Sequence, residues 1–407
     1  MRSSSLGYAL SIIAAALLAA CSGSQLPIGT ARAAPQNHAL AARGDSANYE
    51  VLYSFHKRPG CEQPHASLID VDGTLYGTTG YGGAHDAGCV FSVTTAGREQ
   101  KLYSFRGHQD GAAPFASLVD DGGTLYGTTL GGGGEERGTV FSVTTNGTEQ
   151  VLHRFLEKGS HGGHPQAALI DVGGTFYGTT VGGGAHRAGT VFSITTGGTE
   201  RVLHSFGGAN DGAFPIFASL VSVDGTLYGT TGGGGLYSSS CIYGNGCGTV
   251  FSITTGGSEK VLYNFRNGGT DGGNPVAGLI DVGGTLYGTT KTGGTYNDGT
   301  VFSITTSGTE NVLYSFGYGT DGKNPIAALI DVGGTLYGTT QNGGGTDKDG
   351  TIFSITTSGT ETVLHRFGGA TDGIVPDASL VDVGGVLYGT TAGGGTDGEG
   401  TVFSLTP

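Results

Sequence analysis

The sequence contains no tryptophan and only one methionine, and charged residues make up 13% of its 407 residues. Basic residues are the scarcer kind: 19 Lys and Arg stand against 33 Asp and Glu, which gives a formal net charge of −14. A surface this acidic does not neutralise phosphate groups. We therefore expect no nucleic acid among the partners.

Several motifs of common chemistries are also missing. The chain has no G-x-S-x-G, no G-x-x-x-x-G-K-[ST] and no H-E-x-x-H, so the corresponding hydrolases, nucleotide-binding proteins and metalloproteases lack support. The many Gly-x-Gly strings indicate turns, because no helical period follows them to bind phosphate. The sequence therefore identifies no catalytic residue.

Glycine dominates instead, with 83 copies, and 11 prolines accompany it. Without a period, this content would indicate a disordered, low-complexity chain. Here the pattern recurs about every 50 residues, and no strict Gly-x-y triplet runs along the chain. Disorder as the main state and a collagen helix are both excluded.

The chain begins with a predicted export signal over residues 1–20. Arg2 supplies a short positive region, and the apolar stretch from Leu6 to Ala20 is too short to span a bilayer comfortably. It ends in L-A-A-C, which resembles a bacterial lipobox, where the cysteine is acylated after cleavage. We expect a lipid on Cys21, and Ser22 favours the outer membrane by resemblance to other lipoproteins.

Residues 21–48 are rich in small and polar residues without periodicity, which predicts a flexible tether. A plain secretory signal, cut after the A-R-A of residues 31–33, is the alternative to the lipobox. Both interpretations place the protein outside the cytoplasm, in the periplasm or at the cell surface of a bacterium. A lipid anchor would be its only contact with the membrane.

The other four cysteines form two close pairs in the sequence, Cys61 with Cys89 and Cys241 with Cys247. Export to an oxidising compartment favours a disulfide in each pair. Zinc is the competing interpretation of four cysteines, but the spacing lacks C-x2-C pairs.

One unit recurs seven times from Tyr49 to the end. Its marker, V-L-[YH]-x-F or a close variant, begins at positions 51, 101, 151, 202, 261, 312 and 363. Each L-Y-G-T-T or F-Y-G-T-T segment contributes a tyrosine: Tyr76, Tyr126, Tyr177, Tyr228, Tyr287, Tyr337 and Tyr388. Each V-F-S or I-F-S segment contributes a phenylalanine: Phe91, Phe141, Phe192, Phe251, Phe302, Phe353 and Phe403. We interpret these residues as structural, packing one unit against the next.

Each unit contains four short segments of strand composition. In the second unit they are Ala116–Asp120, Thr124–Thr129, Thr139–Thr145 and Glu149–Phe155, separated by glycine or proline turns. Four antiparallel strands repeated seven times predict an all-β fold over residues 49–407, a seven-bladed β-propeller. We place the segment with the small alanine innermost, because the centre of a propeller is crowded.

The two ends of the repeat region predict how the ring closes. The seventh unit stops after its third strand, and a spare outer strand, Tyr49–Phe55, precedes the first unit. Pairing that strand with the last three completes the final blade and removes exposed sheet edges. Without tryptophan, WD-type repeats, sialidase-type Asp boxes and tryptophan-docked quinone propellers are poor fits.

The repeat resembles the GloVer-type tandem repeats of bacterial choice-of-anchor proteins. The resemblance rests on V-L-[YH]-x-F, P-x-A-S-L, G-T-L-Y-G-T-T, G-G-x-x-x-x-G-T-V-F and T-T-x-G-T-E, and it covers residues 49–407. It implies a propeller displayed at the cell surface, and it brings no known activity and no catalytic residues.

Variation between units is concentrated in two connections, from the fourth strand to the next first strand and from the second strand to the third. Both lie on one face of a propeller, which we predict to be the binding face. His161, His164 and His186 on this face are candidate zinc ligands, and with Arg187 they are candidate binding residues. Exposed loop histidines are the alternative interpretation.

Two further features belong to the same face. Asp-Gly recurs in one loop, and with other acids it forms a predicted acidic rim suited to calcium, although no contiguous D-x-D-x-D-G loop is present and simple turns are the alternative. The members are Asp110, Asp211, Asp271, Asp321, Asp372, Asp298, Asp347, Asp349, Asp397 and Glu399. The fourth unit carries an insertion, Leu236–Gly246, whose Tyr237 and Tyr243 are suited to gripping a sugar or a protein.

Three functions fit these observations. The leading hypothesis is a monomeric, lipid-anchored propeller that binds a glycan or a protein at the bacterial cell envelope. The second is a metal-assisted polysaccharide lyase or hydrolase that uses the histidines of the early units. The third is a passive surface protein, which suits the close similarity between the units.

Overall fold

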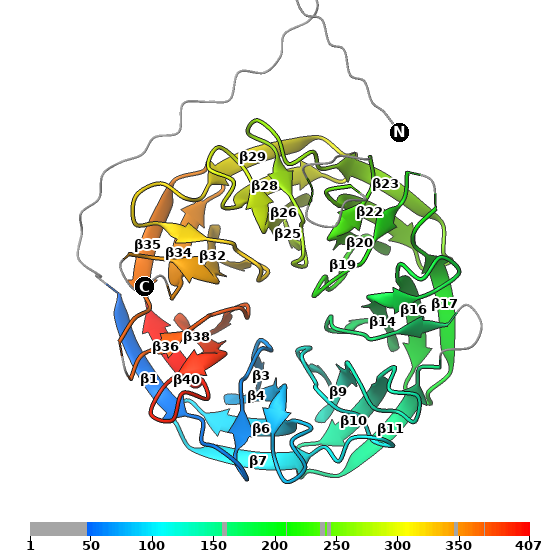
Figure 1. The fold of residues 1–407 in the computed structure, drawn as a ribbon, viewed down its shortest axis with the longest axis vertical. Coiled ribbons are helices and arrows are strands. Elements are labelled where there is room, and N and C mark those ends of the chain that lie inside the picture. The colour runs from blue at the N-terminus through cyan, green and yellow to red at the C-terminus, as the bar shows by residue number, and fades with distance from the viewer. Residues whose placement is uncertain are drawn as a thin grey trace, which may run out of the picture. The chain divides into compact units, whose positions relative to one another are not determined.

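The computed structural model describes residues 47–407 except 157–160, 209, 237–240, 242–245, 346–348 and 370. The predicted signal peptide, Cys21 and almost all of the tether lie outside these residues. The described chain forms seven four-stranded antiparallel sheets arranged in a ring (Figure 1). It contains no α-helix, and therefore no helix long and apolar enough to cross a membrane. The structure confirms the seven-bladed β-propeller.

The strands form four concentric sets. The innermost strands are β3 (Ile69–Val71), β8 (Val119–Asp121), β13 (Ile170–Val172), β19 (Val221–Val223), β25 (Ile280–Val282), β31 (Ile330–Val332) and β37 (Val381–Val383). The second strands are β4 (Thr74–Thr79), β9 (Thr124–Thr129), β14 (Thr175–Thr180), β20 (Thr226–Thr231), β26 (Thr285–Thr290), β32 (Thr335–Thr340) and β38 (Val386–Thr391). The third strands are β6 (Cys89–Thr94), β10 (Thr139–Thr144), β16 (Thr190–Thr195), β22 (Thr249–Thr254), β28 (Thr300–Thr305), β34 (Thr351–Thr356) and β40 (Thr401–Thr406). The outermost strands are β7 (Glu99–Ser104), β11 (Glu149–Arg154), β17 (Glu200–Ser205), β23 (Glu259–Asn264), β29 (Glu310–Ser315), β35 (Glu361–Arg366) and β1 (Asn48–Ser54).

The ring closes through the two ends of the repeat region. Strand β1 pairs antiparallel with β40, with Val51 opposite Phe403 and Asn48 opposite Thr406. The last blade therefore consists of three C-terminal strands and one N-terminal strand, as the spare strand predicted.

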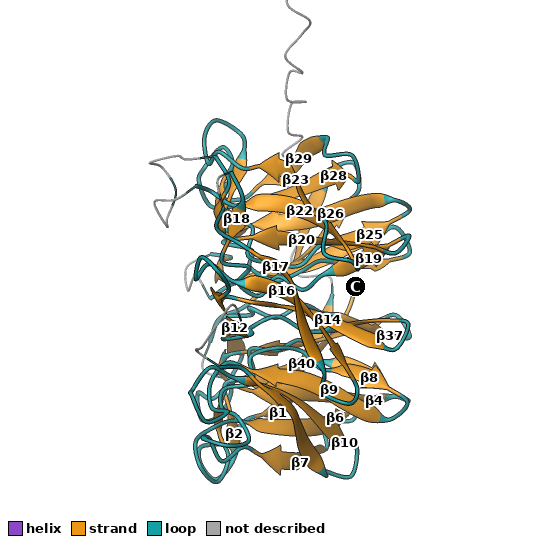
Figure 2. Ribbon diagram, turned by 90° about the vertical axis from the view of Figure 1, so that its right-hand side faces the viewer, coloured by secondary structure: helices purple, strands orange, loops and turns teal. Residues whose placement is uncertain are grey.

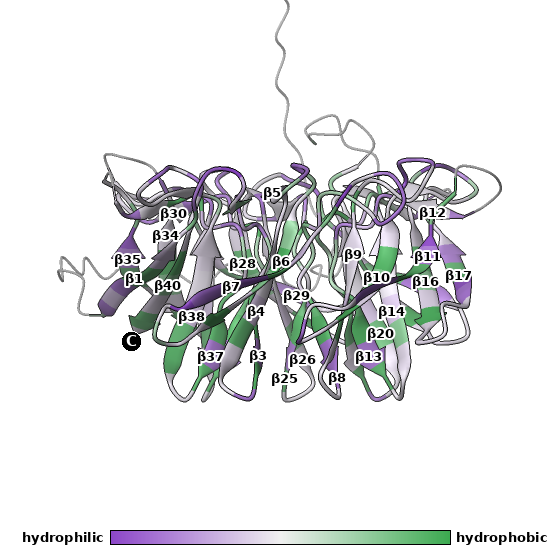
Figure 3. Cartoon of the chain, turned by 90° about the horizontal axis from the view of Figure 1, so that it is seen from below, coloured by the Kyte–Doolittle hydropathy of each residue, from purple (hydrophilic) through white to green (hydrophobic). Residues whose placement is uncertain are grey.

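Short ribbons cap the blades on one face of the ring, which the sequence did not predict. Each ribbon pairs the loop that enters a blade with the loop between its second and third strands. The pairs are β2 (Cys61–Glu62) with β5 (Tyr81–Gly82), β12 (Gly162–Gly163) with β15 (Gly182–Gly183), β18 (Gly212–Ala213) with β21 (Gly233–Gly234), β24 (Gly272–Gly273) with β27 (Thr292–Gly293), β30 (Gly322–Lys323) with β33 (Asn342–Gly343) and β36 (Gly373–Ile374) with β39 (Gly393–Gly394). Figures 2 and 3 show these ribbons on one face and the turns after the innermost strands on the other. We call the first the ribbon face.

The cores lie between neighbouring blades. All seven phenylalanines of the V-F-S or I-F-S segments are fully buried, and Phe141 meets Phe105 of the preceding blade edge to face at 5.0 Å. The glycine of Y-G-T-T makes room for this ring: a Cβ on Gly127 would lie 2.7 Å from Phe141 and 2.9 Å from Leu118. Burying each aromatic side chain contributes about 2–3 kcal/mol.

Backbone and hydroxyl hydrogen bonds also join one blade to the next. The residue before each proline adopts a left-handed conformation, for example Ala113 at φ 54°. Its N–H donates to Ala87 of the preceding blade at 2.9 Å, and its carbonyl accepts from Leu130 of its own blade at 3.0 Å. The hydroxyl of Thr78 donates to the carbonyl of Ala116 in the next blade at 3.0 Å. These bonds fix the residue after each proline against the ring axis.

The four remaining cysteines form the two disulfides that the sequence predicted. Cys61 is bonded to Cys89, with their Cα atoms 5.8 Å apart, and Cys241 is bonded to Cys247, with their Cα atoms 5.0 Å apart. The first disulfide joins β2, which follows the closing strand, to β6 of the first blade. The second one spans the base of the insertion in the fourth blade.

Candidate binding site at the ring axis

A small cavity lies where the blades converge. The predicted inner segment, P-x-A-S-L, is irregular backbone that precedes the innermost strand: Ala116–Asp120 was predicted, and β8 begins only at Val119. These segments from six of the seven blades line a cavity of about 70 Å³. This is enough for about two ordered water molecules, at roughly 30 Å³ each.

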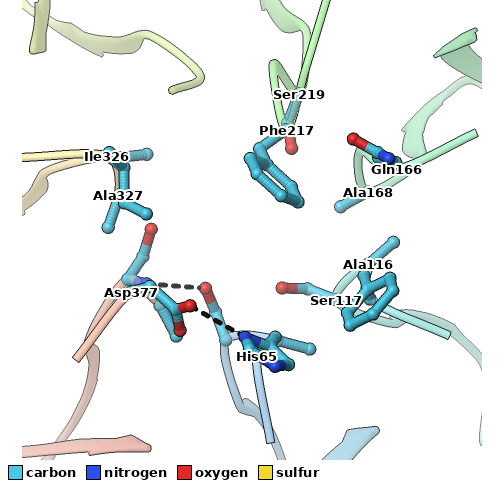
Figure 4. A pocket seen from close by; sticks show the side chains of 16 residues that line it. His65, Ala116, Ser117, Gln166, Ala168, Phe217, Ser219, Ile326, Ala327 and Asp377 are labelled. Atoms are coloured by element: carbon cyan, nitrogen blue, oxygen red, sulfur yellow. Dashed lines mark hydrogen bonds and ion pairs between the residues drawn. The ribbon is translucent and has the colours of Figure 1, made fainter. Parts of the chain in front are cut away.

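The wall of the cavity combines small residues with one larger residue from each of the six contributing blades. Ala116, Ala168 and Ala327 belong to the small set, and they keep the axis open (Figure 4). The position after the proline varies between blades, whereas the proline and the alanine of the segment recur in all seven. In chain order the residues after the proline are His65, Phe115, Gln166, Ile216, Val276, Ile326 and Asp377.

One polar pair spans the first and last blades at this wall. Nδ1 of His65 donates to Oδ2 of Asp377 at 2.8 Å, and both side chains are largely buried. The other carboxylate oxygen, Oδ1 of Asp377, is buried and has no hydrogen-bond partner among the described residues. A buried acceptor without a partner is costly, so this oxygen is suited to a ligand hydroxyl or amide.

Aromatic groups complete the wall. Phe115 meets the ring of His65 edge to face at 5.1 Å. The fourth blade has one extra residue after its proline, and this places Phe217 in the left-handed region at φ 52° with 39% of its surface exposed. A bulky residue in this region is strained, and such strain gathers at functional sites. Figure 4 shows Phe217 and Gln166 on one side of the cavity and His65 with Asp377 opposite.

Sequence reasoning missed this site. It assigned the repeated motif to structure as a whole and looked for function only in the long connections. The available signal was finer: inside P-x-A-S-L the position after the proline varies most, while the proline, the alanine and the leucine recur in every unit.

The candidate binding residues of the sequence lie elsewhere on the ribbon face. His161 and Arg187 line a cavity of about 620 Å³ together with Arg137 and Leu156. His164 has both ring nitrogens engaged, by Nη1 of Arg137 at 3.1 Å and by the carbonyl of Leu130 at 3.1 Å.

The structure does not gather the three predicted histidine ligands. His186 is exposed, and Nδ1 of His161 lies 3.7 Å from Glu200. Among the described residues, the one group of ligand atoms within 4.8 Å of one another is His204, Asp211 and Glu259. Tyr237 and Tyr243, the candidate residues of the insertion, lie outside the described residues.

The Asp-Gly aspartates form local pairs at the outer edge of the ring. The hydroxyl of Tyr103 donates to Asp110 at 2.7 Å, and that of Tyr314 donates to Asp321 at 2.8 Å. Of the other predicted rim acids, Asp298 pairs with Lys323 at 2.8 Å and Asp397 with His56 at 3.0 Å. Asp347 lies outside the described residues.

A glutamate from the next blade joins several of these pairs. Burial, with the charge of the neighbouring aspartate, raises the pKa of Glu149, Glu310 and Glu361 to about 7. Each of these glutamates also has one buried carboxylate oxygen without a hydrogen-bond partner among the described residues. The rim is therefore a repeated structural arrangement with carboxyl groups that titrate near neutral pH.

The fold and its repeats define the class of this protein as a tandem-repeat β-propeller, which fits an interaction module. The model of the Gloeobacter/Verrucomicrobia repeat family matches residues 30–243 and 237–407. The chain belongs to that family. No curated protein matches it in sequence.

Solved structures share the fold at low sequence identity. One is PorZ, a bacterial surface component of the type-IX secretion system of Porphyromonas gingivalis, with a TM-score of 0.52 and 15% identity over 86% of this chain and 47% of that one. Another is puromycin hydrolase, with a TM-score of 0.52 and 10% identity over 81% of this chain and 50% of that one. The chain thus spans about half the length of these two proteins.

Proposed function

We propose that this protein is an exported binding module that takes the uncharged end of a glycan at the ring axis. The observation that carries the proposal is the variation of the residues after the prolines, five of which line the axial cavity together with Phe217. Inter-blade hydrogen bonds hold the backbone on both sides of these residues, so a change of side chain there alters the ligand surface without altering the ring.

The chemistry of the wall supports a sugar. Phe115 and Phe217 offer apolar faces for the C–H groups of a sugar ring, and Gln166 and Asp377 offer hydrogen bonds to its hydroxyls. Among the described residues, no Lys or Arg lines this cavity, and Asp377 does, which disfavours an anionic ligand. The small volume fits one end of a chain, with the rest of the ligand lying across the ribbon face.

The proposed location is the bacterial cell envelope, with the propeller held by lipid on Cys21. This part of the proposal rests on the lipobox-like L-A-A-C and on the tether after it. The two disulfides support an oxidising compartment.

Hydrolysis at the axis is the competing function, because the contact between His65 and Asp377 is that of an oriented general base. Among the described residues, however, the second ring nitrogen of His65 has no hydrogen-bond partner, so no serine is held as its nucleophile. The geometry therefore favours binding.

The test is a glycan array probed with the full chain and with two variants. Phe217→Ala removes the exposed aromatic group at the axis, and Tyr318→Ala removes a similarly exposed one at 45% in a loop of the rim. The proposal expects binding that is lost at least tenfold in the first variant and kept in the second. Equal binding by both variants would place the ligand away from the axis, and cleavage of a bound glycan would favour the hydrolase.

A further inference from the structure

The outer edge of the ring repeats one arrangement of three side chains at the junctions between blades. An aromatic residue of the outermost strand, an aspartate of the following loop and a glutamate at the start of the next outermost strand meet there. At the junction of blades 1 and 2 they are Tyr103, Asp110 and Glu149. At the junction of blades 3 and 4 the tyrosine is replaced by a histidine, which gives His204, Asp211 and Glu259.

With histidine in place of tyrosine, the three side chains become a set of possible metal ligands. Nε2 of His204 lies 3.0 Å from Oδ2 of Asp211, and one ligand atom from each of the three residues lies within 4.8 Å of the others. Oε1 of Glu259 is buried without a hydrogen-bond partner among the described residues. All three residues are half-buried at the edge of the ring, so an ion has access to them.

The charges at this junction differ from those at two of the related ones. Arg106 and Arg154 offset the charge of Glu149 at the junction of blades 1 and 2, and Arg366 offsets that of Glu361 at the junction of blades 5 and 6.

At the junction of blades 3 and 4, Gly207 occupies the place of Arg106, and Asn264 that of Arg154. Among the described residues, His204 is the one basic side chain that offsets the charge of Glu259. Two carboxylates therefore face each other here without a guanidinium.

We propose that His204, Asp211 and Glu259 bind one divalent transition-metal ion and that this ion fastens blade 3 to blade 4. One imidazole and two carboxylates fit Zn²⁺, which takes nitrogen and oxygen ligands in a small coordination shell. Ca²⁺ takes about six to eight oxygen ligands, which this set does not supply. Three protein ligands leave one position of a tetrahedral shell for water.

Two other junctions serve as internal comparisons. At the junction of blades 2 and 3, His161 occupies the place of the aspartate. Among the described residues, the ligand atoms of His153, His161 and Glu200 do not all lie within 4.8 Å of one another.

At the junction of blades 6 and 7, His365 lies 3.2 Å from Asp372, and Tyr49 occupies the place of the glutamate. Neither junction brings one imidazole and two carboxylates together.

The experiment measures bound zinc in the full chain. The protein is stripped with chelator, dialysed against micromolar Zn²⁺ and analysed for metal content, and its thermal midpoint is recorded with and without the ion. We expect one zinc per chain and a higher midpoint.

The variant His204→Tyr reproduces the tyrosine found at the junctions of blades 1 and 2 and of blades 5 and 6, so we expect it to retain the fold. We expect it to bind no zinc and to show no rise in midpoint, while the controls His365→Tyr and His161→Ala keep both. The proposal would be overturned by any of three results: no zinc in the wild type, zinc retained in His204→Tyr, or zinc lost in His161→Ala.

Discussion

At the scale of the residue, the glycine of the T-T-x-G-T-E turn has two structural roles. It adopts a left-handed backbone conformation, and it lies against the backbone of the preceding blade. Gly147 has φ +89°, and a Cβ there would lie 2.5 Å from the carbonyl oxygen of Leu102 in the preceding blade. Gly123, in the turn after β8, has φ +85°, and a Cβ there would meet nothing within 4 Å. Both glycines relieve backbone strain, but only Gly147 permits close approach of two blades.

We therefore expect Gly147→Ala to be far more damaging than Gly123→Ala. The left-handed conformation alone costs about 1–2 kcal/mol for alanine. Gly147→Ala adds a clash with backbone that cannot move without opening the blade junction, so its free energy of unfolding should fall by several kcal/mol. Chemical denaturation of the two variants measures the difference. Equal losses would show that the blades do not depend on this contact.

The rim glutamates give the stability a pH dependence of definite sign. The pKa of Glu310 is raised to about 7, chiefly by burial, from an ordinary value of 4.5. A raised pKa stabilises the folded state below the ordinary value, and this contribution is lost as the pH rises through the folded value. Ionised Glu310 is thus unfavourable at pH 8.

The variant Glu310→Gln keeps the shape and removes the ionisation. We expect its thermal midpoint to match the wild type at pH 5 and to exceed it at pH 8, by the equivalent of roughly 1–2 kcal/mol after allowing for solvent screening. Glu50→Gln, at an exposed position of β1, is the control and should change neither value. If the difference in midpoint between the variant and the wild type did not vary with pH, the raised pKa that we attribute to burial of Glu310 would be contradicted.

At the scale of the element, the closing strand and its disulfide act together. Strand β1 completes the last blade, and the disulfide between Cys61 and Cys89 fastens the chain just after it to the first blade. This disulfide spans 28 residues, whereas the one between Cys241 and Cys247 spans 6. A longer loop loses more entropy when it is closed in the unfolded chain.

Removal of the two disulfides should therefore have unequal effects. By loop entropy, replacing Cys61 and Cys89 with serine costs about 3–4 kcal/mol, and replacing Cys241 and Cys247 costs about 2 kcal/mol. Denaturant unfolding without reducing agent measures both. A larger loss from the second pair would mean that the insertion, rather than the ring closure, limits the stability of the molecule.

At the scale of the whole molecule, the sequence predicted the ring far better than its site. Seven copies of one unit repeat each local pattern, so blade number, strand order and closure by Tyr49–Phe55 followed from periodicity alone. The inner strand was placed three residues early in the second blade, because Ala116 and Ser117 have strand composition but turn against the axis. Periodicity carries no signal for such a bend.

The site depends on contacts between blades far apart in the chain, which periodicity does not encode. His65 and Asp377 are 312 residues apart and meet only because the ring closes. His161, His164 and His186 are close in sequence, yet His164 is bonded to Arg137 and Leu130, His161 lies beside Glu200, and His186 is exposed. Conversely, Glu259 joins His204 and Asp211 from the next blade. The side chains that meet at a blade junction come from different repeat units, so the pattern within one unit does not show which of them will be in contact.

The most direct test of the central claim is a crystal structure of the protein with a glycan that it binds on the array. We predict density for a sugar at the ring axis, against Phe217 and Gln166 and within hydrogen-bonding distance of Asp377. Sugar density at the Leu236–Gly246 insertion or in the cavity beside His161 and Arg187, with none at the axis, would contradict the account.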